Sequence, residues 1–91
     1  MVFNKIKGVL GGRVRFMVTG AAPISTDIKN FFKIAMCCPM VEAYGQTEVC
    51  GTCHITDTGD PTDGHVGGPV KTCEYKLEDV SDMEYYAFNP E

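Results

Sequence analysis

The chain has 91 residues, a mass of 9.9 kDa and a formal net charge of −4, so it can form one small domain or part of a larger one. Its 44% hydrophobic and 22% charged residues are typical of folded proteins and argue against intrinsic disorder. Acidic residues outnumber basic ones, 12 to 8, which disfavours a nucleic-acid partner. No apolar run approaches the roughly 20 residues that span a bilayer, and the start of the chain lacks the apolar region of a signal peptide.

The first half of the chain carries the clearest secondary-structure pattern. Apolar residues recur at helical spacing in Phe3–Leu10, and Gly11-Gly12 ends this predicted helix. Arg13–Thr19 turns apolar and β-branched, which predicts a strand. The segment Gly20–Pro23 breaks that strand, because glycine and proline favour turns.

A second helix and a second strand follow. Ser25 or Thr26 can cap the helix, and Pro39 closes it. Its apolar stripe consists of Ile28, Phe31, Phe32, Ala35 and Met36. Met40–Tyr44 predicts a short strand that Gly45 breaks. The order strand, helix, strand over residues 13–44 predicts a βαβ unit with parallel strands and therefore an α/β fold.

The second half is less regular. Gly51–Gly68 is rich in Thr, Asp, Gly and Pro and predicts a long loop, with further strands at Cys73–Val80 and Met83–Phe88. A single βαβ unit cannot cover both faces of a parallel sheet. We therefore expect residues 1–91 to be a segment of a larger α/β domain, incomplete as a domain by itself.

Five cysteines without a secretory signal make a disulfide framework the weaker interpretation. Cys50, Cys53 and His54 form the C-x-x-C-H spacing of c-type haem attachment. The same three side chains could bind zinc, with Cys37, Cys38, His65 or Cys73 as a fourth ligand. A C-x-x-C pair after a strand also permits a redox role. A small haem or metal protein is thus one hypothesis for the function.

A different constellation lies at the ends of the two predicted parallel strands. Gly20, Ala21 and Ala22 follow the first strand, and small residues let a ligand approach the backbone. Tyr44 at the end of the second strand offers a flat face for a base. Ligands of open α/β sheets bind outside these strand ends, so the sequence predicts one side of a nucleotide-triphosphate site.

The same segments resemble a known family. Val18-Thr19-Gly20-Ala21-Ala22-Pro23-Ile24-Ser25 and Glu42-Ala43-Tyr44-Gly45-Gln46-Thr47-Glu48 are similar to motifs of the adenylate-forming (AMP-binding) superfamily. Gly64-His65-Val66-Gly67-Gly68-Pro69 resembles its G-x-V-G-x-P turn. The sequences Leu10-Gly11-Gly12-Arg13-Val14-Arg15 and Gly45-Gln46-Thr47-Glu48 are most similar to those of long-chain fatty-acid–CoA ligases. The resemblance covers about Phe3 to Val80 and implies part of the large N-terminal domain of such an enzyme.

The resemblance implies a two-step reaction and a role for each matched residue. A long-chain fatty acid would attack Mg²⁺-ATP to give acyl-AMP, and coenzyme A would then take the acyl group. Tyr44 would lie against adenine, with Gly20, Ala21, Ala22, Ala43, Gly45 and Gln46 around the same cavity. Thr47 would bind the α-phosphate and Glu48 the Mg²⁺, while 64–69 would be a structural turn.

The resemblance also sets expectations for the parent protein. Phosphate loop, ribose-binding aspartate and catalytic lysine lie outside the matched motifs, so the segment alone would be inactive. The parent would be intracellular and membrane-associated, at the endoplasmic reticulum, the mitochondrial outer membrane or the peroxisome. An adenylating enzyme for another acid is the alternative within the family.

Overall fold

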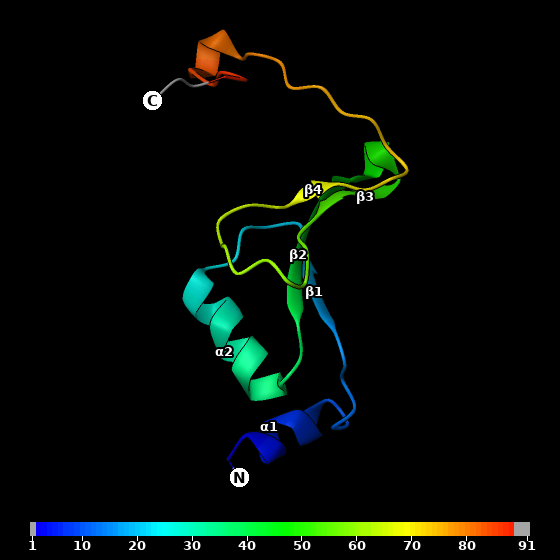
Figure 1. Cartoon of the computed structure of the whole chain (residues 1–91), viewed down its shortest axis with the longest axis vertical. Coiled ribbons are helices and arrows are strands. Elements are labelled where there is room, and N and C mark those ends of the chain that lie inside the picture. Colours follow the sequence, from blue (N-terminus) through cyan, green and yellow to red (C-terminus); the bar gives the residue numbers. More distant parts are fainter. Residues whose placement is uncertain (1, 89–91) are drawn as a thin grey trace.

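The computed structural model describes residues 2–88, which form two helices, a four-stranded sheet and two 3₁₀ turns. The chain ends in an extended arm (Figure 1). The elements are α1 (Val2–Val9), β1 (Met17–Gly20), α2 (Thr26–Met36), β2 (Met40–Gln46), the 3₁₀ turn η1 (Thr47–Val49), β3 (Gly51–Ile55), β4 (Gly68–Pro69) and the 3₁₀ turn η2 (Ser81–Met83). The predicted α/β class, both helices and the βαβ unit are confirmed, although β1 is shorter than expected.

Local capping sets the ends of the helices. α1 stops where Gly11 and Gly12 both take left-handed backbone angles, with φ of +85° and +72°. At the start of α2, Ser25 Oγ accepts a hydrogen bond from the Ile28 amide at 3.4 Å. At its end, Cys37 is left-handed and Pro39 cannot continue a helix.

The sheet has the order β1-β2-β3-β4 and is mixed. β1 and β2 pair in parallel, from Met17 opposite Met40 to Gly20 opposite Ala43. β3 and β4 are antiparallel to their neighbours. Because β1 and β2 are parallel, their carboxyl ends lie side by side at one edge of the sheet.

The prediction of a long loop over Gly51–Gly68 is wrong at both ends of this segment, where β3 and β4 form. After η1, Cys50 and Gly51 take φ angles of +60° and +119° and reverse the chain along β2. This pairing also carries β2 past Tyr44 to Gln46, through the glycine that was expected to break it. The residues of β3 lack apolar alternation, so nothing local signals a strand.

A bulge interrupts the pairing of β2 with β3. Tyr44 lies opposite His54, but the next residue, Gly45, lies opposite Thr52, so Cys53 is an extra residue in β3. The two backbones approach closely here. A Cβ at Gly45 would overlap backbone atoms of Gly51 and Thr52, so this position requires glycine.

The strands predicted at Cys73–Val80 and Met83–Phe88 are also wrong. Within residues 2–88, the part of the chain after Pro69 contains only η2 and an isolated bridge between Val80 and Tyr85. Figure 1 shows this segment leading away from the sheet as an arm. The start of the arm contacts β3, where the Val70 amide donates a hydrogen bond to the Cys53 carbonyl at 2.8 Å. A strand needs a continuous neighbour for its backbone groups, and the described part of the arm has no such ladder with the sheet.

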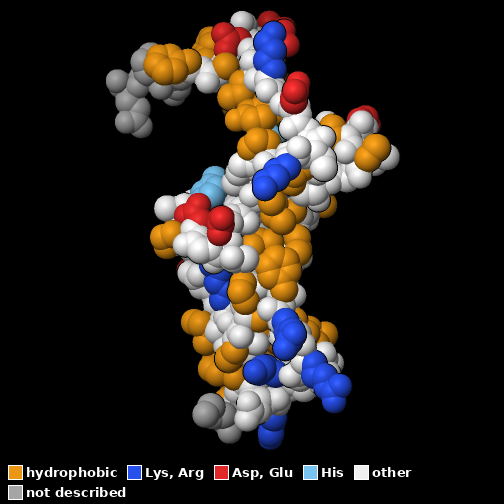
Figure 2. All heavy atoms as spheres, turned by 45° about the vertical axis from the view of Figure 1, so that its right-hand side comes forward, with side chains coloured by type: hydrophobic (Ala, Val, Ile, Leu, Met, Phe, Trp, Pro, Cys, Tyr) orange, Lys and Arg blue, Asp and Glu red, His pale blue; other side chains and the backbone are white. Residues whose placement is uncertain are grey.

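The buried apolar core of the described residues is small and lies around α2 and β2. It consists of Ala35, Met36, Cys38 and Val41. Many large hydrophobic side chains are exposed instead, and Figure 2 shows them along one face of the molecule. No helix among residues 2–88 is long and apolar enough to span a membrane.

Candidate functional site

A hollow of about 390 Å³ opens at the carboxyl ends of β1 and β2. Three segments form its walls: residues 19–24 at the end of β1 and just beyond it, residues 42–45 of β2, and residues 64–66 of the loop between β3 and β4. Its volume falls in the range of about 300–1,000 Å³ typical of small-molecule sites. Six of the predicted site residues line it, namely Gly20, Ala21, Ala22, Ala43, Tyr44 and Gly45.

The wall after β1 is made of small residues in a tight turn. A Cβ at Gly20 would lie 2.8 Å from the Ala43 carbonyl oxygen, so glycine allows the turn to approach β2. Ala21 has a φ of +69°, in the left-handed region that side chains rarely adopt. Such strain is often found where backbone meets a ligand.

Tyr44 provides the aromatic part of the opposite wall. Its side chain is half exposed, and its ring lies edge-on to His54 at a centroid distance of 6.0 Å. His54 in turn lies edge-on to Tyr75 at 5.0 Å. Aromatic pairs favour this geometry, so the contact with His54 helps to fix the Tyr44 ring, which is half exposed and lines the hollow.

A second hollow of about 510 Å³ lies beside the first and shares four of its residues. It adds the predicted residues Gln46 and Thr47. Glu48 lines neither hollow; it is exposed on η1, one residue beyond Thr47. The predicted site residues are thus divided between two hollows that share four lining residues, and Glu48 lies next to Thr47 outside both.

The third wall was expected to be only a structural turn, yet Gly64, His65 and Val66 line the hollow. His65 Nδ1 accepts a hydrogen bond from the Gly67 amide at 3.0 Å, which leaves the proton on Nε2. Nε2 lies 3.0 Å from Asp60 Oδ2 and 2.7 Å from Thr62 Oγ1. These contacts close the loop and place 64–66 opposite Tyr44.

Asp60 is the anionic centre of this loop. Its Oδ1 accepts hydrogen bonds from the Thr62 hydroxyl at 2.6 Å and the Thr62 amide at 2.8 Å. These bonds, with His65 nearby, lower the pKa of Asp60 below its ordinary value of 3.8. Its contribution to stability is therefore present above that value and is lost as the pH falls through the lowered pKa.

Lys29 of α2 is a charged residue with only 3% of its surface exposed. Its Nζ lies 3.0 Å from Glu42 Oε2 and 3.0 Å from Asp63 Oδ1. Burial opposes the charged form, but the contacts with the two carboxylates outweigh it and raise the pKa of Lys29 above 10.5. The stability gained is complete below the ordinary value and is lost as the pH rises through the raised pKa.

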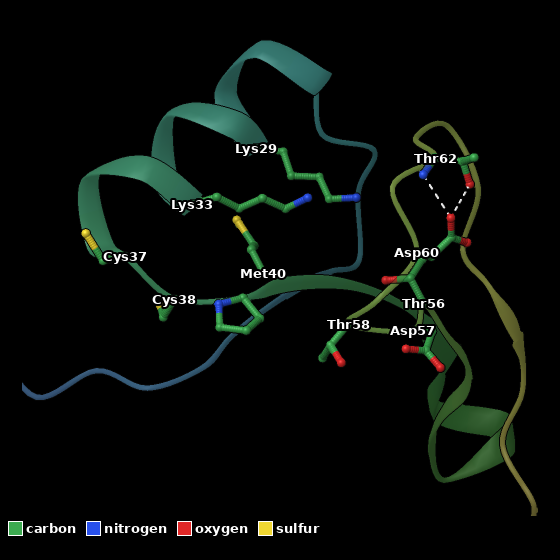
Figure 3. A pocket seen from close by; sticks show the side chains of 11 residues that line it. Lys29, Lys33, Cys37, Cys38, Met40, Thr56, Asp57, Thr58, Asp60 and Thr62 are labelled. Atoms are coloured by element: carbon green, nitrogen blue, oxygen red, sulfur yellow. Dashed lines mark hydrogen bonds between the residues drawn. The ribbon is translucent and has the colours of Figure 1, made fainter.

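The sequence offered a weak signal for Lys29, since it lies on the same helical face as Phe32 and Met36. Figure 3 shows Lys29 and Lys33 extending from α2 toward the loop that carries Asp60 and Thr62. These residues border a separate hollow of about 320 Å³. Its lining was not predicted from the sequence.

The cysteines occupy varied positions and all five are free thiols. In the C-x-x-C-H segment, Cys50 caps η1, whereas Cys53 and His54 belong to the extended strand β3. His54 Nδ1 lies 3.3 Å from Cys53 Sγ. In the described part of the chain, no three His, Cys, Asp or Glu side chains are grouped so that they could hold a metal ion.

The sequence matches the family of AMP-binding enzymes over residues 3–91, so the chain belongs to that family, whose members form adenylates. Its relatives are long-chain fatty-acid–CoA ligases, which confirms the resemblance stated above. Mouse long-chain-fatty-acid–CoA ligase 5 is 59% identical over 91 residues, which is 100% of this chain and 13% of the relative.

Two further relatives extend the comparison. Human long-chain-fatty-acid–CoA ligase 1 is 48% identical over 87 residues, 96% of this chain and 12% of the relative. Arabidopsis long chain acyl-CoA synthetase 7, peroxisomal, is 51% identical over 85 residues, 93% of this chain and 12% of the relative. The chain thus spans about an eighth of the length of these relatives. No solved structure matches it significantly.

Proposed function

We propose that residues 1–91 form part of the AMP-binding domain of a long-chain fatty-acid–CoA ligase and supply one wall of its nucleotide site. The observation that carries this proposal is the hollow at the ends of β1 and β2. Small residues line one side and Tyr44 the other, where a base can stack. The names of the relatives supply the substrate class.

The proposed reaction has two steps. An oxygen of the fatty-acid carboxylate attacks the α-phosphorus of ATP, and the bond to the β-phosphate oxygen breaks to release pyrophosphate. The thiol of coenzyme A, losing its proton, then attacks the acyl carbon, and AMP leaves with the bonding electrons. The role of the chain is to hold adenine and position the α-phosphate, since orientation lowers the barrier.

Each predicted residue has a role in this proposal. Tyr44 stacks on adenine, and the backbone of 20–22 and 43–46 borders the adenosine and acyl groups. The Thr47 hydroxyl donates a hydrogen bond to an α-phosphate oxygen, whose charge grows in the transition state. Thr47 lines the second hollow, which shares four lining residues with the first, and this supports the assignment.

Magnesium fits this site through Glu48. Mg²⁺ in nucleotide sites binds one or two protein carboxylates together with phosphate oxygens and waters. Glu48 is one exposed carboxylate next to Thr47, which suits an ion that arrives with ATP. When bound, the ion neutralises negative charge on the phosphates.

The location of the protein belongs to the same proposal. Two Arabidopsis relatives, 51% and 48% identical, carry the word peroxisomal in their names. We propose attachment to an intracellular membrane, with the peroxisome as the first compartment to examine alongside the endoplasmic reticulum and the mitochondrial outer membrane.

The function can be tested in a chimera of mouse ligase 5 whose matching segment is replaced by residues 1–91. We expect the chimera to catalyse ATP–pyrophosphate exchange that depends on hexadecanoate. Thr47→Ala should lower the exchange rate about 100-fold or more, the usual cost of losing one transition-state donor. Glu48→Gln should lower it and raise the Mg²⁺ concentration needed for half-maximal rate.

Val49→Ala is the matched control, because Val49 is exposed on the same 3₁₀ turn. It should leave the exchange rate nearly unchanged. Equal rates in all three variants would refute the roles of Thr47 and Glu48. A chimera that activates acetate or benzoate but not hexadecanoate would refute the long-chain substrate.

A further inference from the structure

Lys29 forms ion pairs with residues in or next to two walls of the candidate site but does not line the hollow itself. Glu42 belongs to β2, two residues before Tyr44, and itself lines the hollow. Asp63 immediately precedes Gly64, the first residue of the loop wall. The ammonium of Lys29 lies 3.0 Å from a carboxylate oxygen of each.

The ion pairs are well shielded from water. The Lys29 side chain is 4% exposed, and those of Glu42 and Asp63 are 14% and 24% exposed. Removing the ammonium would leave two partly buried carboxylates facing one another without a counter-charge, which is strongly unfavourable. The side that can move is the loop, because β2 is paired on both edges and anchored to Thr56 by two hydrogen bonds of 2.9 Å.

We propose that Lys29 is a positioning residue for ATP: its ammonium holds Glu42 and Asp63 together and thereby sets the separation of Tyr44 from the Gly64–Val66 wall. This inference rests on the proposed function. Lys29 itself does not line the hollow, so it acts through its partners and touches no substrate. Its loss should change the binding of the adenosine group more than that of the fatty acid or coenzyme A.

The test uses the chimera and its steady-state kinetics for all three substrates. Lys29→Met keeps the length of the side chain and removes the charge. It should raise KM for ATP about three- to tenfold. This effect is smaller than the loss of rate that a misplaced reacting group can cause. The KM values for hexadecanoate and coenzyme A should stay within about twofold, the size of a change too small to indicate lost contacts. Lys29→Arg keeps the charge and should restore KM for ATP.

Lys33→Met is the matched control. Lys33 lies one turn further along α2 and extends toward the same loop in Figure 3, but forms no ion pair among residues 2–88. It should leave KM for ATP unchanged. Asp63→Asn is the second variant and should also raise KM for ATP, but by less than Lys29→Met does. If Lys29→Met does not fold, the KM of Asp63→Asn tests the proposal instead.

The outcomes separate the two proposals. An active chimera in which Lys29→Met or Asp63→Asn leaves KM for ATP unchanged overturns the role of Lys29 alone. A fall in kcat with all three KM values unchanged also overturns it, because that pattern reflects general loss of structure. An unsubstituted chimera that forms no acyl-CoA overturns the proposed function and this inference with it.

Discussion

Two positions of the candidate site require glycine because the backbone of a neighbouring segment lies too close for a side chain. Gly20 allows the turn after β1 to lie against Ala43, and Gly45 allows β3 to lie against β2. Both glycines belong to motifs that the sequence identified as site residues. Their physical role is therefore clear even before any ligand is considered, because a Cβ at either position would meet backbone atoms that cannot rotate away.

Gly45→Ala should destabilise the chimera by about 1–3 kcal/mol, the cost of forcing one extra carbon into a packed region. Urea unfolding followed by tyrosine and tryptophan fluorescence measures this loss. Gly68→Ala is the control, since a Cβ at Gly68 has no atom within 4 Å and its φ is not left-handed. Equal unfolding midpoints for the two variants would contradict the close approach of β2 and β3.

The helices and strands differ in whether nearby residues in the sequence are enough to predict them. α2 was predictable because its cap, apolar stripe and terminating proline all lie within residues 25–39. The parallel strands followed from their position around this helix. β3 was not predictable, because it forms only by pairing with β2 and its sequence has no strand periodicity. The burial of Lys29 had only a weak signal in the sequence for the same reason, since it depends on Glu42 and Asp63 in other elements.

The cap of α2 permits a test at this scale. Ser25→Ala should weaken the first turn of α2 by about 0.5–1 kcal/mol, because the Ile28 amide loses its acceptor. In hydrogen–deuterium exchange of the chimera, peptides covering 26–30 should then exchange about two- to fivefold faster. Ser25→Asp keeps an acceptor and should exchange like the unsubstituted protein. No difference between the two variants would mean that the cap contributes nothing.

The whole molecule is elongated, with extents of 52 × 31 × 22 Å. Its radius of gyration is 16.3 Å, whereas a compact chain of this length has about 12 Å. The difference reflects the arm after β4 and the small core. Along the arm, Tyr75, Leu77, Met83, Tyr85 and Phe88 are all more than half exposed. Apolar surface of this extent is normally covered by other protein.

Residues 1–91 expressed alone should therefore aggregate or remain partly unfolded. We expect strong binding of an apolar dye such as ANS and no cooperative thermal transition, since the four buried apolar side chains among residues 2–88 give too small a core. The same residues within the chimera should be soluble and bind little dye. A cooperative transition with dispersed amide signals from the isolated chain would contradict this expectation.

The bulge at Cys53 bears on how this site can vary between related proteins. It places His54 beneath Tyr44 and sets Thr52 against Gly45. Exchanging one side chain for another in β3 leaves this alignment intact. Deleting a single residue between Gly51 and His54 would slide the strand, withdraw the imidazole from Tyr44 and bring a different residue against Gly45. Lineages of this protein should thus accumulate substitutions in β3 while keeping the number of residues between Tyr44 and His54 fixed.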